Sequence, residues 1–276
     1  MTSSMVTSSW LEDHLEDPKV FVVEVTSSPE DTEYKKAHIP GAVWRFWKAL
    51  CWHDTDRQFP EPDEMARRLG AMGVPDDATI VLYGDPVQFG TYPFWALTMG
   101  GARNLRLLDG GRTGWLKEGR PVSIEIPSYP ATQYTSGKGD SSMRMGRDEV
   151  RDGLGKAGQL LLDVRSPEEY NGERVMPPPN FDHGAERKGR IPGAKSFYYR
   201  NVVNEDDTYK SEAELRALFE SAGVGEAKEI ISYCRLSHRA TLVWFAMQHI
   251  LGIEGTRIYD GSWTEWGSIV GFPIEK

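Results

Sequence analysis

Cysteine is scarce in this sequence, and its scarcity limits what the chain can be. Only Cys51 and Cys234 occur among 276 residues, and a chain of this length can bury a core without cross-links. The two thiols could pair, but a reducing compartment favours free thiols. Six scattered histidines and the absence of a Cys-x-x-Cys pair give no ligand cluster, so we expect no metal site.

Long apolar runs and an excess of positive charge are also missing. No run of about 18 apolar residues, the length that a membrane helix needs, occurs in the chain. The first residues, "MTSSMVTSSWLEDHLEDP", lack the basic and apolar regions of a secretory signal. A formal net charge of −9 disfavours general affinity for nucleic acid or anionic lipid. We expect a soluble, cytoplasmic protein that binds neither nucleic acid nor membrane.

The sequence contains an internal repeat that extends over most of its length. The length and a composition of 26% charged and 39% hydrophobic residues fit two globular domains. Three blocks recur in the same order, and so long a period indicates a duplicated domain and not a solenoid. We predict domains at 1–127 and 146–276, joined by a polar linker at 128–145. The paired blocks are "AHIPGAV" (37–43) with "GRIPGAK" (189–195), "IVLYGDPVQFGTYPFWALTMG" (80–100) with "IISYCRLSHRATLVWFAMQHI" (230–250), and "LLDGGRTGW" (107–115) with "IYDGSWTEW" (258–266).

Each copy alternates short β-rich runs with helical stretches. The run at 212–222 follows Ser211, with Glu214 in the position of a capping box and Gly223 at the end. Strands that alternate with helices predict an α/β fold, a parallel sheet with helices on both faces. The predicted strands are "VFVVEV" (20–25), "ATIVLYG" (78–84) and "LRLLDGG" (105–111) in the first copy, and "LLLDV" (160–164), "KEIISYC" (228–234) and "TRIYDGS" (256–262) in the second.

Cys234 lies where a predicted strand hands over to a helix, which we expect to begin at Ala240. Ligands of parallel sheets bind at such ends. The loop "CRLSHR" (234–239) is short, so its backbone is expected to curl and direct several N–H groups at one point, an anion hole. The helix terminus and the charges of Arg235 and Arg239 should favour the thiolate, which is the nucleophile.

A lone cysteine after a strand is most often a buried packing residue, and this interpretation stands for Cys51. For Cys234 the first copy supplies a control. Its counterpart there is Gly84, in a loop "GDPVQF" that has an acid and a proline but no arginine. Only the second copy carries a nucleophile with its cations, so we predict that the first copy is inactive.

The duplicated domain and the motifs "LLDVRSPEEY", "GRIPGA", "CRLSHRA" and "YDGSWTEW" together resemble the rhodanese family, specifically the tandem-domain thiosulfate and 3-mercaptopyruvate sulfurtransferases. The resemblance implies two tandem rhodanese-like domains, a catalytic residue Cys234 and no cofactor. It also implies transfer of a sulfane sulfur from a small-molecule donor, through a Cys234 persulfide, to a thiophilic acceptor such as cyanide, thioredoxin or another thiol. The Cys-x4-Arg spacing from Cys234 to Arg239 favours this reaction over phosphate hydrolysis, for which related enzymes carry Cys-x5-Arg.

The resemblance assigns the substrate-binding residues to the loop and its surroundings. Some members carry a substrate-binding arginine where this chain has Glu169, and many carry glycine and a hydroxyl residue where it has Ser237 and Ala240. His238 is either a further cation when protonated or a solvated side chain. The candidates are Arg235, Leu236, Ser237, His238 and Arg239, with Arg165, Arg187 and Trp263 as further members.

Three of the residues near the motifs have a structural interpretation. Asp163 is expected to anchor backbone groups with Arg165 as its ion partner, because Glu24 occupies the same position in the first copy. Trp266 is shared with the first copy as Trp115, so we expect it in the core.

Thiosulfate is the expected donor, because members selective for 3-mercaptopyruvate have a small neutral residue where this chain has Arg235. The alternatives left open are a 3-mercaptopyruvate sulfurtransferase, a non-catalytic persulfide carrier or binding module, and a phosphatase or arsenate reductase of the short-loop kind.

Overall fold

The computed structural model describes residues 4–177 and 179–276, which divide into two compact units. Unit 1 extends to Ser141 and includes Glu205–Thr208, and unit 2 comprises Ser142–Asn204 and Tyr209–Lys276. The division at Ser141 falls inside the segment 128–145 that we propose as the linker. Part of that segment packs on unit 1, since the Gly137 N–H donates to the Gly101 carbonyl at 2.7 Å.

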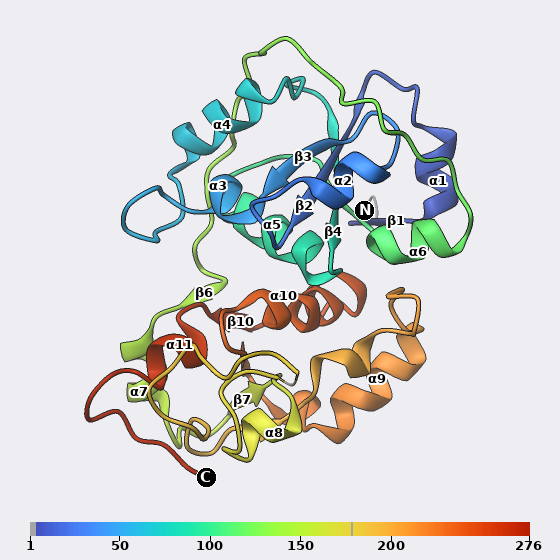
Figure 1. Cartoon of the computed structure of the whole chain (residues 1–276). Coiled ribbons are helices and arrows are strands. Elements are labelled where there is room, and N and C mark those ends of the chain that lie inside the picture. The colour runs from blue at the N-terminus through green and yellow to red at the C-terminus, as the bar shows by residue number, and fades with distance from the viewer. Residues whose placement is uncertain (1–3, 178) are drawn as a thin grey trace. The chain divides into compact units, whose positions relative to one another are not determined.

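Unit 1 is built on a five-stranded parallel sheet with strand order β1-β5-β4-β2-β3 (Figure 1). The strands are β1 (Met5–Val6), β2 (Val20–Thr26), β3 (Val43–Phe46), β4 (Thr79–Asp85) and β5 (Leu105–Leu108). The helices are α1 (Ser8–Asp13), α2 (Thr32–Lys36), α3 (Trp47–Cys51), α4 (Pro62–Ala71), α5 (Gln88–Met99) and α6 (Gly111–Lys117).

Unit 2 repeats this topology with strand order β6-β10-β9-β7-β8. Its strands are β6 (Arg144–Met145), β7 (Gln159–Asp163), β8 (Lys195–Ser196), β9 (Glu229–Tyr233) and β10 (Thr256–Tyr259). Its helices are α7 (Arg147–Gly153), α8 (Pro167–Tyr170), α9 (Glu212–Ser221), α10 (His238–Phe245) and α11 (Ser262–Trp266), with a π-helix at Ala246–Ile250 and 3₁₀ turns at Tyr199–Val202 and Val224–Glu226. The predicted α/β class, with two parallel sheets covered by helices, is confirmed.

The two copies also share their register. Glu24 of β2 lies opposite Tyr83 of β4, and Asp163 of β7 lies opposite Tyr233 of β9. In each copy the tyrosine hydroxyl donates to the carboxylate, which Tyr233 reaches at 2.7 Å. The duplication seen in the sequence is therefore preserved in the pairing of the central strands.

Local sequence signals explain how the elements begin and end. Helix α9 starts with the predicted capping box, in which the Glu214 N–H donates to Ser211 and the Glu214 carboxylate accepts from the Ser211 N–H at 3.0 Å. Helix α10 begins at His238, two residues before the predicted start at Ala240. The difference arises because Ser237 adopts the left-handed conformation, with φ of 59°, and turns the chain directly into the helix.

The central strands bury aromatic and branched side chains in separate cores. In unit 2, Trp263 and Trp266 of α11 are fully buried with Tyr233 and Tyr259, so the expected core position of Trp266 is confirmed. Its counterpart Trp115 belongs to the core of unit 1. Burial of these aromatic side chains removes apolar surface from water and stabilises each unit.

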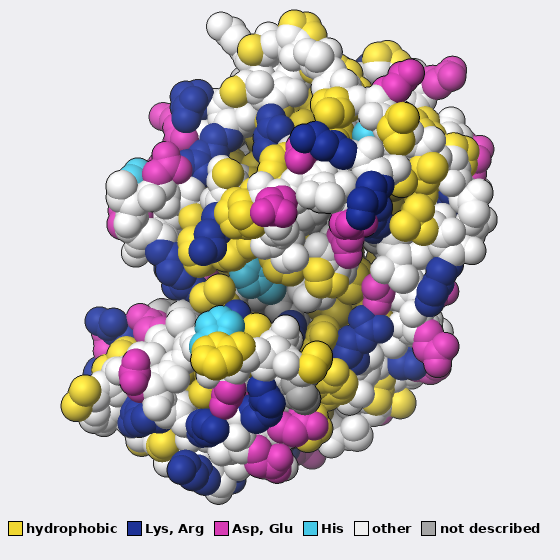
Figure 2. All heavy atoms as spheres, viewed as in Figure 1, with side chains coloured by type: hydrophobic (Ala, Val, Ile, Leu, Met, Phe, Trp, Pro, Cys, Tyr) yellow, Lys and Arg dark blue, Asp and Glu magenta, His cyan; other side chains and the backbone are white. Residues whose placement is uncertain are grey.

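The surface and the helix lengths bear on possible partners. Acidic and basic side chains are interspersed over the face shown in Figure 2. Within the part of the chain that the structure describes, no helix has the length and apolar character required to cross a membrane.

Candidate active site

The loop after β9 holds Cys234 in a buried turn. Cys234 directly follows the strand, its exposed fraction is 1%, and Ser237 closes the turn before α10. Both cysteines of the chain are free thiols. Cys51 lies at the end of α3 with no exposed surface, and burial raises the pKa of its thiol well above the ordinary range. The thiol at 51 is thereby kept protonated, which suits a packing residue.

Ser262, a residue that the sequence analysis did not single out, fixes the backbone of the loop. Its Oγ accepts hydrogen bonds from the N–H groups of Cys234 and Ser237, at 3.3 and 3.1 Å, and donates to the Tyr259 carbonyl at 2.9 Å. Two of the N–H groups expected in the anion hole are thus used internally. Among the described residues the N–H groups of Arg235 and Leu236 have no hydrogen-bond partner, and these remain available to an anion.

The start of α11 supports the loop from the other side. The N–H of Trp263 donates to the Cys234 carbonyl at 2.9 Å, and the N–H of Thr264 donates to the Arg235 carbonyl at 3.0 Å. Ser237 Oγ adds a hydrogen bond to the buried carboxylate of Asp260 at 3.0 Å. The loop is therefore preorganised on both sides, which keeps the thiol in one position.

Arg239 is engaged by an acidic partner inside the protein. Its two Nη atoms donate to the two carboxylate oxygens of Glu169, at 2.6 and 2.8 Å, and both side chains are buried. Burial alone would raise the pKa of Glu169, but the hydrogen bonds and charge of Arg239 outweigh it and lower the pKa. The pair neutralises most of the charge of Arg239 in the site.

Arg165 and Arg187 are also bound to protein groups. Arg165 is fully buried and makes a bidentate ion pair with Asp163, at 2.6 Å for the shortest contact, as the sequence predicted. Its guanidinium also lies 4.6 Å from the centre of the Trp263 ring. Arg187 donates to four backbone carbonyls between residues 266 and 272, at 2.6 to 3.1 Å. Both arginines thus act on the scaffold in this structure.

Arg235 differs from these three arginines. Its side chain is half-buried, and it makes no hydrogen bond or ion pair to any of the described residues. Burial lowers the pKa of Arg235, and the adjacent Cys234 opposes this shift. A partly desolvated guanidinium with unused donors beside a thiol has the chemistry to bind an anion, and this role of Arg235 stays a prediction.

The remaining predicted residues lie in the same segment. Leu236 is partly buried, and His238 is buried in the first turn of α10. Trp263 supports the loop through its backbone, and its indole N–H donates to the Arg187 carbonyl at 2.9 Å. Their contact with substrate stays a prediction.

The corresponding loop of unit 1 has no space for a side chain at the position that matches Cys234. A Cβ atom at Gly84 would lie 2.3 Å from backbone atoms of Phe89 and Gly90. Asp85 follows and lies 3.5 Å from Arg112, whose side chain also reaches Glu24 at 3.7 Å. Arg112 aligns in sequence with Trp263. The guanidinium beside the buried acid Glu24 therefore comes from α6 in unit 1. In unit 2 the guanidinium beside Asp163 comes from Arg165, two residues after that acid.

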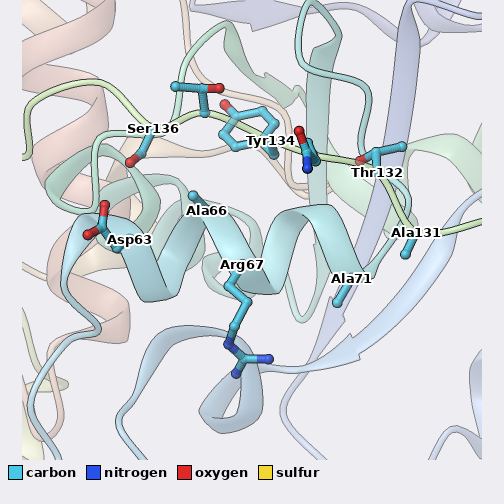
Figure 3. A pocket seen from close by; sticks show the side chains of 10 residues that line it. Asp63, Ala66, Arg67, Ala71, Ala131, Thr132, Tyr134 and Ser136 are labelled. Atoms are coloured by element: carbon cyan, nitrogen blue, oxygen red, sulfur yellow. The ribbon is translucent and has the colours of Figure 1, made fainter.

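The first copy also has a hollow on its surface, which differs from the Cys234 loop. A hollow of about 620 Å³ lies between α4 and residues 131–136 (Figure 3). Its lining contains Asp63 and Arg67 but no nucleophile and none of the predicted site residues, and in Figure 3 the Arg67 side chain points away from it. The described residues contain no group of histidine, cysteine or acidic side chains arranged to hold a metal ion.

The architecture and the loop define a class: a duplicated parallel α/β domain in which one copy holds a preorganised cysteine at a strand end. The model of the rhodanese-like domain matches twice, at residues 7–118 and 146–269. The chain belongs to the rhodanese family, as the sequence motifs indicated.

Relatives of known name extend over the whole chain. The sulfur carrier protein TtuD of Thermus thermophilus is 42% identical over 276 residues, covering 99% of this chain and 96% of TtuD. A "Putative thiosulfate sulfurtransferase" of Haloferax volcanii is 39% identical over 279 residues, covering 99% and 96%.

Solved structures show the same fold at lower identity. The crystal structure of YnjE has a TM-score of 0.84 at 22% identity, covering 99% of this chain and 68% of YnjE. The anaerobic ergothioneine biosynthesis enzyme of Chlorobium limicola has a TM-score of 0.83 at 23% identity, covering 99% and 70%. At this identity the likeness concerns the fold alone.

Proposed function

We propose that this protein is a thiosulfate sulfurtransferase with Cys234 as its nucleophile. The thiolate attacks the outer sulfur of thiosulfate, the sulfur–sulfur bond breaks, and its electron pair leaves on sulfite. The cysteine then carries a persulfide. A thiophilic acceptor such as cyanide or a thiol then forms a bond to the outer sulfur with its own electron pair. The sulfur–sulfur bond of the persulfide breaks, and its electron pair stays on Cys234, which regenerates the thiolate.

The observation that carries the proposal is the state of Arg235. Three nearby arginines are bound by Glu169, by Asp163 or by backbone carbonyls, whereas the Arg235 side chain makes no hydrogen bond or ion pair to the described residues. The free N–H groups of Arg235 and Leu236 add donors in the same loop. Hydrogen-bond donors and a cation next to a thiol attract an anion. They therefore favour an anionic substrate whose outer sulfur can reach that thiol.

The choice of thiosulfate rests on charge. Arg235 and Arg239 are both cations of the loop, but Arg239 forms a bidentate pair with Glu169, so Arg235 supplies the attraction for the anion. Thiosulfate is a compact dianion, whereas 3-mercaptopyruvate carries one carboxylate farther from its sulfur. A single cation adjacent to the nucleophile therefore still favours thiosulfate, by less than two cations would.

A second candidate, a persulfide carrier, is favoured by the 42% identical relative, which is named a sulfur carrier protein. A carrier and an enzyme both form the persulfide, but they differ in its release. The carrier would hand its sulfur to a partner protein and turn over slowly with cyanide.

The test is the intact mass of the protein after incubation with thiosulfate and, separately, with 3-mercaptopyruvate. We expect a gain of one sulfur from thiosulfate, which cyanide removes, and no gain in Cys234→Ser. Cys51→Ser is the matched control and should gain the sulfur as the wild type does. A gain from 3-mercaptopyruvate alone would refute thiosulfate as the sulfur donor, and a persulfide that cyanide removes only slowly would favour the carrier.

Arg235→Gly tests the donor assignment by kinetics. A hydrogen bond to a charged group contributes about 1.5 to 3 kcal/mol, so kcat/KM for thiosulfate should fall by roughly ten- to a hundredfold. Turnover of 3-mercaptopyruvate should change much less. A wild-type preference for 3-mercaptopyruvate that survives the substitution would contradict the charge argument.

A further inference from the structure

Unit 2 contains extra chain beside the active-site loop. Five positions separate Tyr34 from Ile39 in the first copy, whereas 21 separate Tyr170 from Ile191 in the second. The end points are equivalent, because each tyrosine hydroxyl donates to the alanine carbonyl of the "IPGA" motif, at 2.7 and 2.9 Å. Residues 181–187, which we call the arm, therefore have no counterpart in unit 1.

The arm is fixed at both ends. Near its start, the Asp182 carboxylate accepts the backbone N–H groups of Val175 and Met176 at 2.7 and 3.1 Å. At its end, Arg187 is held by four carbonyls, and its own carbonyl accepts the indole N–H of Trp263 at 2.9 Å. The arm is thus tied to α11, the helix that also supports the Cys234 loop.

Between these anchors the arm meets Arg235. Gly184 has φ of 111°, a conformation that side chains rarely adopt. A Cβ atom at Gly184 would lie 2.4 Å from Nη1 of Arg235, and 3.4 and 3.5 Å from its Cδ and Cζ. Nη1, the end of a flexible and half-buried side chain, would have to retreat by about 1 Å to reach an ordinary contact distance. The guanidinium therefore lies against the bare backbone of Gly184.

We infer that Gly184 is a positioning residue that seats the Arg235 guanidinium beside Cys234, and that the arm thereby sets the preference for a compact dianionic donor. The inference rests on the proposed function. No hydrogen bond or ion pair to the described residues fixes the Arg235 guanidinium, so the backbone of Gly184 is a surface that restricts where this long side chain can go. A shift of about 1 Å in a charged binding group is enough to reduce transfer strongly.

The experiment compares Gly184→Ala with Gly193→Ala. Gly193 also has a positive φ, of 76°, but a Cβ atom there would meet nothing within 4 Å. We expect Gly184→Ala to lower kcat/KM for thiosulfate by about tenfold, mainly through KM, with little change for 3-mercaptopyruvate. Gly193→Ala should leave both values near those of the wild type.

A second background separates positioning of Arg235 from general damage to the arm. In Arg235→Gly no guanidinium lies against Gly184, so adding Gly184→Ala should cause no further loss of kcat/KM for thiosulfate. A further tenfold loss in that background, or an equal loss for both donors, would overturn the inference. The affinity of Cys234→Ser protein for sulfite, measured by calorimetry, should also fall with Gly184→Ala, and an unchanged affinity would overturn it too.

The same experiments distinguish this inference from the proposed function. If wild-type protein takes no sulfur from thiosulfate, the proposed function fails on its own. If it takes sulfur and Gly184→Ala behaves as Gly193→Ala does, the function stands and the role of the arm is refuted.

Discussion

Replacing Glu169 by Gln should destabilise unit 2 strongly, because it leaves the buried charge of Arg239 without a counter-ion. Both carboxylate oxygens of Glu169 accept from Arg239, at 2.6 and 2.8 Å, and one of them also accepts the Ser166 N–H at 3.0 Å. A glutamine retains one acceptor and turns an N–H group toward the guanidinium. Glu169 is fully buried and Arg239 is 9% exposed, so water cannot replace what is lost.

The expected magnitude follows from the burial of the pair. Breaking a buried ion pair by removing one partner costs about 3 to 5 kcal/mol. Guanidinium chloride unfolding of a domain of this size has a slope of roughly 4 kcal/mol per molar, so the midpoint for unit 2 should fall by about 1 M. Replacing both residues by Leu should recover much of this loss, because no unpaired charge then remains.

The assay is guanidinium unfolding, followed by tryptophan fluorescence and circular dichroism. Glu212→Gln is the control, since the Glu212–Arg216 pair on α9 lies at 3.9 Å with both side chains largely exposed, and its loss should not move the midpoint measurably. A midpoint shift below about 0.25 M for Glu169→Gln would refute the claim that the substitution leaves the buried charge of Arg239 uncompensated.

Three further predictions concern other residues. Cys234→Ser should abolish sulfur transfer without unfolding the protein, whereas Cys51→Ser should keep turnover; equal losses, measured as thiocyanate formation, would indicate a redox pair instead. Gly84→Cys should yield no second persulfide by intact mass and should lower the melting temperature, because its Cβ meets the backbone of Phe89 at 2.3 Å; a second cyanide-labile sulfur would contradict this. Burial raises the pKa of Glu24 to about 7, from 4.5 when unfolded, so its contribution to stability is full below about pH 4.5 and about 3 kcal/mol is lost as the pH rises through 7. Thermal unfolding between pH 4.5 and 8 should show this slope in the wild type and not in Glu24→Gln, and an equal slope in both proteins would rule Glu24 out as its source.

The sequence predicted those parts of the molecule that depend on local pattern. Strand runs of branched residues, the Ser211 capping box and the internal repeat each carry a signal within a short window, and the structure contains the corresponding elements. The position of Cys234 after a strand was predicted in the same way. The start of α10 was placed two residues late because a left-handed serine at 237 is not a usual helix entry.

Contacts between distant residues were not predictable in the same way. Nothing in "DVRSPEEY" shows that Glu169 meets Arg239, 70 positions away, or that Ser262 accepts two N–H groups from the cysteine loop. A signal for Ser262 was present, since the first copy has Gly111 in its place, but it gains meaning only when the two loops are seen to touch. Arg235 is likewise unpaired only because the acidic side chains near it, such as Glu169, are paired with other groups.

The different origins of the guanidinium in the two copies limit how far their parts can be exchanged. In unit 2 it comes from Arg165, two residues after the acid in sequence, and this frees the first turn of α11 for Ser262 and Trp263. In unit 1 Arg112 occupies the equivalent turn, the first of α6. Transplanting "CRLSHR" alone into unit 1 would therefore bring the nucleophile without its support. To build a second reactive centre in unit 1, the loop, the start of α11 and Arg165 would have to be transferred together.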